Sequence, residues 1–193
     1  MANEFYALMG RMRYITRWGL MRNTFSENIQ EHSHQVAVLA HALALIRRDI
    51  LKLEGPDPDR CAVAALYHDA SEILTGDMPT PVKYYNPAIR EAYRQVEQSA
   101  CDKLIEMLPS DLQEEYDALI RPQDTDSEEM RLVKAADKIS ALIKCIEETS
   151  QGNREFLSAR RATEAAIRKM AIPAADEFLE QYIPAYELTL DDQ

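Results

Sequence analysis

Two adjacent residues that are costly to bury, His68 and Asp69, lie inside an apolar stretch of the sequence. They follow Ala62-Val63-Ala64-Ala65-Leu66-Tyr67 and precede Ala70, a pattern typical of a helix that faces a core. Burying a charge is unfavourable unless the charge is paired or coordinates a metal ion. The pair therefore indicates a site that binds something, and three other residues become candidate partners: His32, Glu72 and Asp137.

A divalent metal ion is the ligand that these residue types favour, because imidazoles and carboxylates are its common donors. On one continuous helix over 58–74, Glu72 lies four residues after His68 and three after Asp69, so the three side chains share a face. A further ligand from each of two other helices would fill most of the coordination shell. Open positions would remain for water and substrate, as a catalytic metal site requires.

The helix predicted over 29–53 offers three histidines, and helical geometry separates them. His34 and His41 share a face that is opposite to that of His32. His32 lies in the first turn, directly after a loop, where functional residues concentrate. We therefore expect His32 to be the ligand, and His34 and His41 to serve packing or to lie on the surface.

Asp137 is the candidate from the third helix, because small apolar residues around it indicate an inward face. Taken alone, it would be an ordinary aspartate paired with Lys134 or Lys138. Because the proposed metal shell still lacks a ligand, we expect Asp137 to fill that position instead.

The elements that position these residues are all predicted to be helices, because glycine is scarce and no stretch alternates in the way of a strand. We expect one compact all-α domain over 1–193, with six to eight helices. Asn28 and Glu31 are expected to form a capping box at the start of the helix over 29–53. Gly76 is expected to end the helix over 58–74, and the prolines at 79 and 81 argue against a helix over 77–81. The predicted helices span roughly 3–16, 29–53, 58–74, 86–108, 110–120, 126–151, 153–171 and 173–183. Asp126 with Glu129 could cap the helix that carries Asp137.

The net charge of -11 argues against a protein that coats nucleic acid or an anionic membrane surface. The amino terminus lacks the pattern of a secretory signal, and no apolar run approaches the ~20 residues of a membrane helix. The cysteines at 61, 101 and 145 have no paired spacing, which is typical of reduced cytosolic thiols. We therefore expect a cytoplasmic protein that binds neither a nucleic acid polymer nor a membrane.

Three short motifs together resemble a known pattern. Glu31-His32-Ser33, Tyr67-His68-Asp69-Ala70-Ser71-Glu72 and Ala135-Ala136-Asp137 look like the H…HD…D signature of the HD-domain metal-dependent phosphohydrolases. The match is closer to one group, the bacterial 5′-deoxynucleotidases of that superfamily, and spans most of the chain, thinning after about residue 160. The motifs that narrow it are Arg17-Trp18, Leu20-Met21-Arg22-Asn23, Glu27-Asn28, Thr75-Gly76-Asp77 and Pro79-Thr80-Pro81-Val82-Lys83-Tyr84. Gly19 departs from the family, in which a proline follows the Arg-Trp pair, and this would loosen the loop.

The resemblance implies removal of phosphate from 2′-deoxyribonucleoside 5′-monophosphates with one divalent metal ion, Co, Mn or another first-row transition metal. It also implies a homodimer. Apolar stripes over roughly 139–146 and 174–186 exceed the needs of the core and would allow such a dimer. By resemblance, Arg17 orients the phosphate, Trp18 packs against the sugar and rejects a 2′-hydroxyl, and Glu72 and Asp77 handle protons and the attacking water. The implied metal ligands are His32, His68, Asp69 and Asp137, and the implied substrate contacts are Arg17, Trp18, Asp69, Asp77, Met78, Pro79, Thr80 and Asp137.

Counting charges adds a hypothesis of our own. Two ligand carboxylates neutralise a divalent ion, so ionised Glu72 and Asp77 would leave the site negative before a phosphate arrives, and Arg17 and Lys83 would offset only part of this. We predict that one of Glu72 and Asp77 keeps its proton and acts as general acid towards the leaving 5′-oxygen.

Other functions compete with this one. An HD protein could hydrolyse another nucleotide phosphate ester, and a helical interaction module could hold a structural metal without being an enzyme. Taken singly, Glu72 could be a surface carboxylate, Trp18 a core anchor and Arg17 a solvated charge. The module predicts a closed metal shell and no use for Arg17, Glu72 or Asp77, whose placement around the motifs favours the enzyme.

Overall fold

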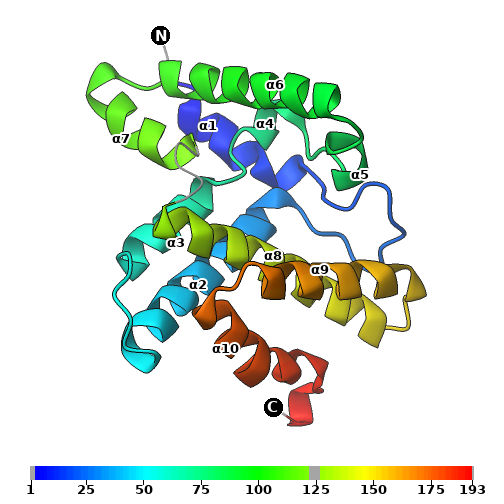
Figure 1. The fold of residues 1–193 in the computed structure, drawn as a ribbon. Helices are drawn as coiled ribbons and strands as arrows, with labels where there is room; N and C mark the ends of the chain where they lie inside the picture. Colours follow the sequence, from blue (N-terminus) through cyan, green and yellow to red (C-terminus); the bar gives the residue numbers. More distant parts are fainter. Residues whose placement is uncertain (1–2, 122–126, 193) are drawn as a thin grey trace. The chain divides into compact units, whose positions relative to one another are not determined.

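The structure is a computed structural model that describes residues 3–121 and 127–192. In these ranges the chain is helical, with no strand and one isolated antiparallel bridge between Thr16 and Asn28 (Figure 1). The prediction of an all-α fold is confirmed. The described residues form two compact units: the first contains 3–22, 26–33 and 67–121, and the second contains 23–25, 34–66 and 127–192.

The first unit is built on the amino-terminal helices and on the long helix α6. Its core consists of Phe5, Ala70, Cys101, Leu104, Ile105, Leu108 and Ile120, with Tyr67 and Tyr116 packed against it. Tyr67 and Ala70 flank the His68-Asp69 pair, so the core fixes both sides of that turn. The elements of this unit are α1 (Phe5–Met9), the 3₁₀ helix η1 (Gly10–Tyr14), α4 (Glu72–Thr75), α5 (Thr80–Lys83), α6 (Pro87–Glu106) and α7 (Ser110–Ile120).

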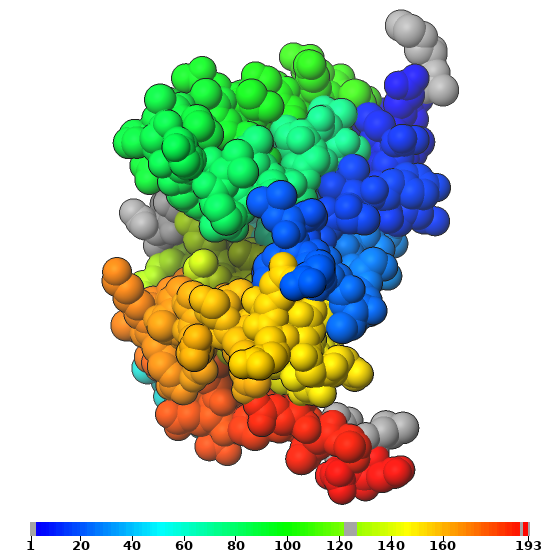
Figure 2. All heavy atoms as spheres, turned by 90° about the vertical axis from the view of Figure 1, so that its right-hand side faces the viewer, coloured from blue at the N-terminus to red at the C-terminus, as the bar shows by residue number. Residues whose placement is uncertain are grey.

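The second unit is organised around α8 (Glu128–Ser150), which packs against α9 (Leu157–Lys169) and α10 (Pro173–Gln181). Figures 1 and 2 show α9 and α10 side by side, in orange and red. The remaining elements are a π-helical turn η2 (Ile46–Ile50) and the 3₁₀ segments η3 (Arg154–Phe156), η4 (Ile183–Glu187) and η5 (Leu190–Asp192). Two helices run from one unit into the other, α2 (Ile29–Leu45) and α3 (Pro58–Tyr67).

The apolar stripes that suggested a dimer surface are used inside the chain. Ile139, Leu142, Ile143 and Ile146 on α8 are fully buried or nearly so, and so are Phe178 and Leu179 on α10. Burial within its own unit accounts for the stripe of α8, because apolar area already removed from water needs no second copy. The stripe over 174–186 is buried only in part, with Tyr182 exposed, and the homodimer stays a prediction.

Local signals predicted the helix ends well where a side chain makes the cap. Asn28 Oδ1 accepts hydrogen bonds from the amides of Gln30 and Glu31, and the Glu31 carboxylate accepts one from the Asn28 amide, as a capping box requires. Gly76 ends α4 with a φ of 72°, a conformation that favours glycine. Ser127 caps α8 by accepting from the Met130 amide; the suggested cap Asp126 lies outside the described residues.

The predictions for 77–81 and for the end of the helix over 29–53 are wrong. The segment 77–81 was expected to hold no helix, but α5 begins at Thr80, because Pro81 lies in the first turn, where a missing amide proton costs nothing. The long helix predicted over 29–53 ends its α-helical part at Leu45 and continues as the π-helical turn η2. No helix in the described residues is both long and apolar enough to cross a membrane.

Candidate functional site

The His68-Asp69 pair lies in a tight turn and not within a continuous helix. α3 ends at Tyr67, and the backbone then turns with the Ala70 amide donating to the Tyr67 carbonyl at 2.9 Å and the Glu72 amide to the Asp69 carbonyl at 3.0 Å. The predicted helix over 58–74 is therefore interrupted. At three residues per turn, residues three apart lie one above the other, so Glu72 still lies on the same side as Asp69.

His32 meets this turn from the first turn of α2. Its ring is fully buried, its Nε2 lies 3.6 Å from Asp69 Oδ2, and His68 Nε2 lies 3.2 Å from the same oxygen. One ligand atom from each of the three residues lies within 4.8 Å of the other two. The structure thus brings together three of the four predicted metal ligands. His34, by contrast, is exposed, and His41 Nε2 lies 3.5 Å from Oδ1 of the exposed Asp59.

The chemistry of this cluster fits a divalent first-row metal ion. Two neutral imidazoles and one carboxylate are a common donor set for such ions. The Asp69 carboxylate stays ionised: burial opposes its charge, but His68, His32 and Arg17 outweigh burial and lower its pKa below the ordinary value. A half-buried anion between two imidazoles is a preformed place for a cation.

A short stretch of paired backbone brings Arg17 to the cluster. The segment after η1 runs antiparallel to the residues before α2, with the Arg17 amide donating to the Glu27 carbonyl at 2.9 Å and the Ile29 amide to the Ile15 carbonyl at 3.0 Å. In this position Arg17 Nη1 lies 3.4 Å from Asp69 Oδ2. The guanidinium is therefore beside the carboxylate that the metal would share, as expected for a group that holds a phosphate.

Glu27 is a residue of this site that the sequence reasoning did not select. Its Oε2 accepts a 2.6 Å hydrogen bond from Trp18 Nε1 and one of 3.3 Å from Arg17 Nε, and its Oε1 lies 3.7 Å from His32 Nδ1. Burial opposes the Glu27 charge, but His32, Arg17 and Trp18 outweigh it and lower the pKa of the carboxyl. Its sequence signals were its place in the Glu27-Asn28 motif of the resemblance and beside the Asn28 cap, five residues before His32.

Glu72 and Asp77 lie in surroundings that disfavour their charge. Burial raises the pKa of Glu72 to about 9, and the carboxylates of Asp69 and Asp77 add to the effect. Burial also raises the pKa of Asp77, although Arg17 opposes this. Glu72 Oε2 is buried and accepts no hydrogen bond from any described residue. Both residues are thus placed to hold or exchange a proton.

The other predicted site residues are less tightly placed. Met78 and Pro79 are half-buried in the loop before α5, and Thr80 at its start is exposed. Lys83 forms a 2.8 Å ion pair with Glu97, so its charge is compensated there, contrary to the expectation that it would offset charge at the site. Asp137 lies on α8 in the second unit with its side chain half-buried, and its ligation stays a prediction.

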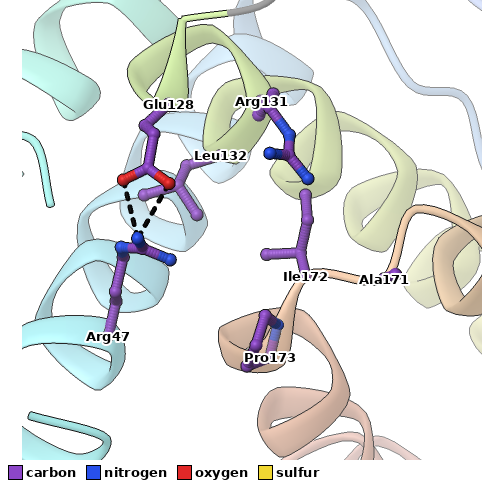
Figure 3. A pocket seen from close by; sticks show the side chains of 7 residues that line it. All are labelled: Arg47, Glu128, Arg131, Leu132, Ala171, Ile172 and Pro173. Atoms are coloured by element: carbon purple, nitrogen blue, oxygen red, sulfur yellow. Dashed lines mark hydrogen bonds and ion pairs between the residues drawn. The ribbon is translucent and has the colours of Figure 1, made fainter. Parts of the chain in front are cut away.

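A surface pocket of the second unit contains none of the predicted site residues. Figure 3 shows its seven lining residues, with Arg47 directed at the Glu128 carboxylate, 2.7 Å away. That ion pair neutralises one of the two arginines in the pocket. The pocket is lined by Arg47, Glu128, Arg131, Leu132, Ala171, Ile172 and Pro173.

Comparison with known proteins is consistent with this site. The chain is 47% identical over 191 residues to a 5′-deoxynucleotidase of Vibrio vulnificus, with 98% of this chain and 97% of the relative covered. It is 46% identical over 191 residues to a 5′-deoxynucleotidase of Erwinia tasmaniensis, with 98% and 96% covered.

Solved structures share the fold. An HD-domain phosphohydrolase from Listeria innocua superposes with a TM-score of 0.80 at 26% identity, covering 95% of this chain and 88% of that one. The cyanophage S-2L HD phosphohydrolase DatZ, solved with dA and one catalytic Zn²⁺ ion, superposes with a TM-score of 0.66 at 21% identity, covering 95% and 96%. The model of the family described as 5′-deoxynucleotidase YfbR-like matches residues 4–186. The chain belongs to this YfbR-like 5′-deoxynucleotidase family.

Proposed function

We propose that the chain is a metal-dependent 5′-deoxynucleotidase, which hydrolyses 2′-deoxyribonucleoside 5′-monophosphates to deoxyribonucleosides and phosphate. One observation carries the proposal: the cluster of the buried His32 with the half-buried His68 and Asp69, and Arg17 beside it. The family match and the end-to-end similarity to relatives named 5′-deoxynucleotidase support the same reaction.

His32, His68 and Asp69 would hold one divalent metal ion, and we propose Asp137 as the fourth ligand. Co²⁺, Mn²⁺ or another first-row ion would suit mixed imidazole and carboxylate donors. When bound, such an ion supplies a more acidic water and polarises phosphoryl oxygens. The position of Arg17 beside Asp69 favours a catalytic metal over a structural one, since a closed structural site needs no arginine placed to bind a phosphate.

Arg17 and Trp18 would recognise the two halves of the substrate. The planar guanidinium of Arg17 matches a phosphate in a bidentate way. The indole of Trp18 would cover C2′, so that a ribonucleotide would bring a hydroxyl against an aromatic face without a hydrogen-bond partner. The half-buried loop of Asp77, Met78 and Pro79, together with Thr80, would line the rest of the pocket.

Glu72 and Asp77 would move the protons. As the oxygen of water forms its bond to phosphorus, the bond from phosphorus to O5′ breaks, and O5′ must receive a proton. One of the two carboxyls would donate that proton, and the other would accept the proton of the attacking water. The buried side chain of Glu72, the half-buried one of Asp77 and the nearby Asp69 charge support the presence of one protonated member.

The test is phosphate release from dAMP and AMP side by side, after chelation and after return of Co²⁺ or Mn²⁺. We expect metal-dependent release from dAMP and little from AMP. Equal release from both would retain the phosphatase and reject the Trp18 filter. No release from either, with metal bound and the helical fold intact, would point to another phosphate ester or to a module without enzymatic activity.

We further propose that the protein works as a homodimer in the cytoplasm. The resemblance to its family supports the dimer, and the three buried cysteines, which form no disulfide in the described residues, support a reducing compartment. Sedimentation of the purified chain tests the dimer: a monomer at micromolar concentration would reject it.

A further inference from the structure

We propose that Glu27 is a positioning residue that links the metal ligand His32 to the sugar-facing Trp18. The link to substrate selectivity rests on the proposed function, whereas the link to metal binding and to the indole does not. All the residues involved belong to the first unit. The inference follows from how the two carboxylate oxygens of Glu27 are used.

The two oxygens of Glu27 face different partners. Oε2 accepts from Trp18 Nε1 at 2.6 Å and from Arg17 Nε at 3.3 Å, while Oε1 faces His32 Nδ1 at 3.7 Å. The side chain is 10% exposed, that of Arg17 13%, and that of His32 fully buried. One buried carboxylate therefore contacts a proposed sugar filter, a proposed phosphate clamp and a metal ligand.

Only a carboxylate satisfies this arrangement. Trp18 Nε1 and Arg17 Nε are both obligatory donors, and Nδ1 of His32 must be a donor if Nε2 is to bind metal. An amide in place of the carboxylate would have to turn its NH₂ group towards one of these donors. Glu27→Gln, which is nearly isosteric, therefore breaks at least one of the contacts while it preserves volume.

The contact to His32 fixes which ring nitrogen is available. His32 Nε2 lies on the Asp69 side of the ring, 3.6 Å from Oδ2. A carboxylate behind Nδ1 keeps the proton on that nitrogen and leaves the Nε2 lone pair for the metal, and partners of this kind commonly contribute 10–100-fold to metal affinity. Glu27 is in the right place to do this for His32.

The contact to Trp18 fixes the direction of the indole. Trp18 has a φ of 60°, a conformation that residues other than glycine rarely adopt, and the next residue, Gly19, has no neighbouring atoms within 4 Å of an added Cβ. The turn is closed by the Met21 amide donating to the Trp18 carbonyl at 2.9 Å. Without the 2.6 Å bond to Glu27, the ring loses the charge-assisted contact that orients it.

The first test needs no substrate. Trp18 is the only tryptophan of the chain, so indole fluorescence reports on this side chain alone. For Glu27→Gln we expect stronger quenching by acrylamide, and Co²⁺ affinity lower by roughly 10–100-fold, with unchanged circular dichroism. The matched control is Glu91→Gln, which makes the same change at an exposed carboxylate of α6 paired with Arg94; wild-type values are expected there.

The second test is a double-mutant cycle on selectivity. Trp18→Phe keeps an aromatic face and removes the N–H that Glu27 accepts. If Glu27 acts on selectivity through that bond, each single variant lowers the ratio of kcat/KM for dAMP to that for AMP by about tenfold. The double variant should then be no worse than the poorer single one, because coupled residues are not additive.

Two results would overturn the proposal. Wild-type quenching and wild-type Co²⁺ affinity in Glu27→Gln would remove the link, and so would multiplicative effects on selectivity in the double variant. If Glu27→Gln does not fold, Glu27→Asp replaces it, since it keeps the charge but withdraws the carboxylate by one methylene; the same changes are expected. A wild-type chain inactive on dAMP would reject the proposed function, and the fluorescence and Co²⁺ results would still decide the role of Glu27.

Discussion

Lys144 and Glu148 form a buried ion pair one turn apart on α8, with Nζ 2.6 Å from Oε1 and almost no exposure of either side chain. The pair holds a loop that is distant in sequence: Lys144 also donates to the Phe25 carbonyl at 2.7 Å and lies over the Phe25 ring, and Glu148 accepts from the amide and hydroxyl of Thr24. Two buried charges thus fasten the segment that ends two residues before Glu27.

Removing either member of the pair should destabilise the protein strongly. Lys144→Met or Glu148→Gln leaves the other group buried without its counter-charge, and such losses are typically about 3–5 kcal/mol. Urea unfolding would measure the change in the free energy of unfolding. Glu164→Gln is the matched control, because Glu164 pairs with Arg168 one turn away on the exposed face of α9 and should change stability by less than about 0.5 kcal/mol. Equal effects at the two sites would contradict the expectation.

The same pair predicts a pH dependence of stability. Burial alone would raise the pKa of Glu148, but hydrogen bonds from Lys144, Asn153 and Thr24 outweigh it and lower the pKa to about 2, from an ordinary value of 4.5. A carboxyl with a depressed folded pKa stabilises the protein above its unfolded pKa, and this contribution is lost as the pH falls through the folded pKa. The stability gap between wild type and Glu148→Gln should therefore narrow between about pH 4.5 and about pH 2. Urea unfolding at about pH 7 and about pH 3 checks this, and a constant gap would contradict it.

Local sequence signals predicted the helix that presents His32, because the information is contained within four residues. The Asn28 and Glu31 capping box forms as expected, and the choice of His32 over His34 and His41 needed only the helical repeat and its place in the first turn after a loop. The interruption after Tyr67 was not predictable in this way. Nothing in the apolar run before His68 marks the change from α-helical to tighter turns, because it depends on how Tyr67 and Ala70 pack into the core of the first unit.

Contacts between residues that are distant in the sequence were also not predicted. The contacts of Glu27 became visible only when the backbone pairing of Thr16 with Asn28 placed Arg17 and Trp18 beside it, a contact between segments that have no common periodicity. The stripe containing Ile139 and Ile143, which is buried in the structure, had seemed to leave room for a dimer, because one sequence does not tell whether an apolar face packs on its own chain or on another. Lys83 was expected to offset charge at the site, because the sequence alone does not show that it pairs with Glu97.

Arg17 should be sensitive even to a change that keeps its charge. Arg17→Lys replaces a planar fork by a point charge, so it loses bidentate phosphate contact and the geometry of its bond to Glu27. We expect kcat/KM for dAMP to fall by about 10–100-fold, the scale of one hydrogen bond to a charged group. Steady-state kinetics with dAMP measure the loss. The corresponding change Arg94→Lys, at an exposed arginine of the same unit, should leave kcat/KM unaltered, and an unaltered Arg17→Lys would remove Arg17 from substrate binding.

Metal removal should separate a catalytic site from a structural one. The helices of the first unit are held by an apolar core around Phe5, Leu104 and Ile120, so the fold does not depend on His32, His68 and Asp69 being bridged. Chelation is therefore expected to abolish phosphate release from dAMP while the far-ultraviolet circular dichroism stays nearly unchanged, and added Mn²⁺ or Co²⁺ should restore the activity. Loss of helical signal on chelation would instead favour a structural metal.

The last prediction concerns the proton that the leaving oxygen needs. If one of Glu72 and Asp77 is the general acid, its proton must be present at low pH and is lost as the pH rises through its pKa, so log kcat should fall on the alkaline side. Burial raises the pKa of Glu72 to about 9 and also raises that of Asp77, so a limb due to Glu72 would begin near the upper end of the profile. Profiles from about pH 5 to about pH 9 for wild type, Glu72→Gln and Asp77→Asn would identify the acid, because only the variant that lacks it should lose the alkaline limb. A flat wild-type profile over this range would reject a carboxylic acid as the proton donor and leave the leaving oxygen to be protonated by water.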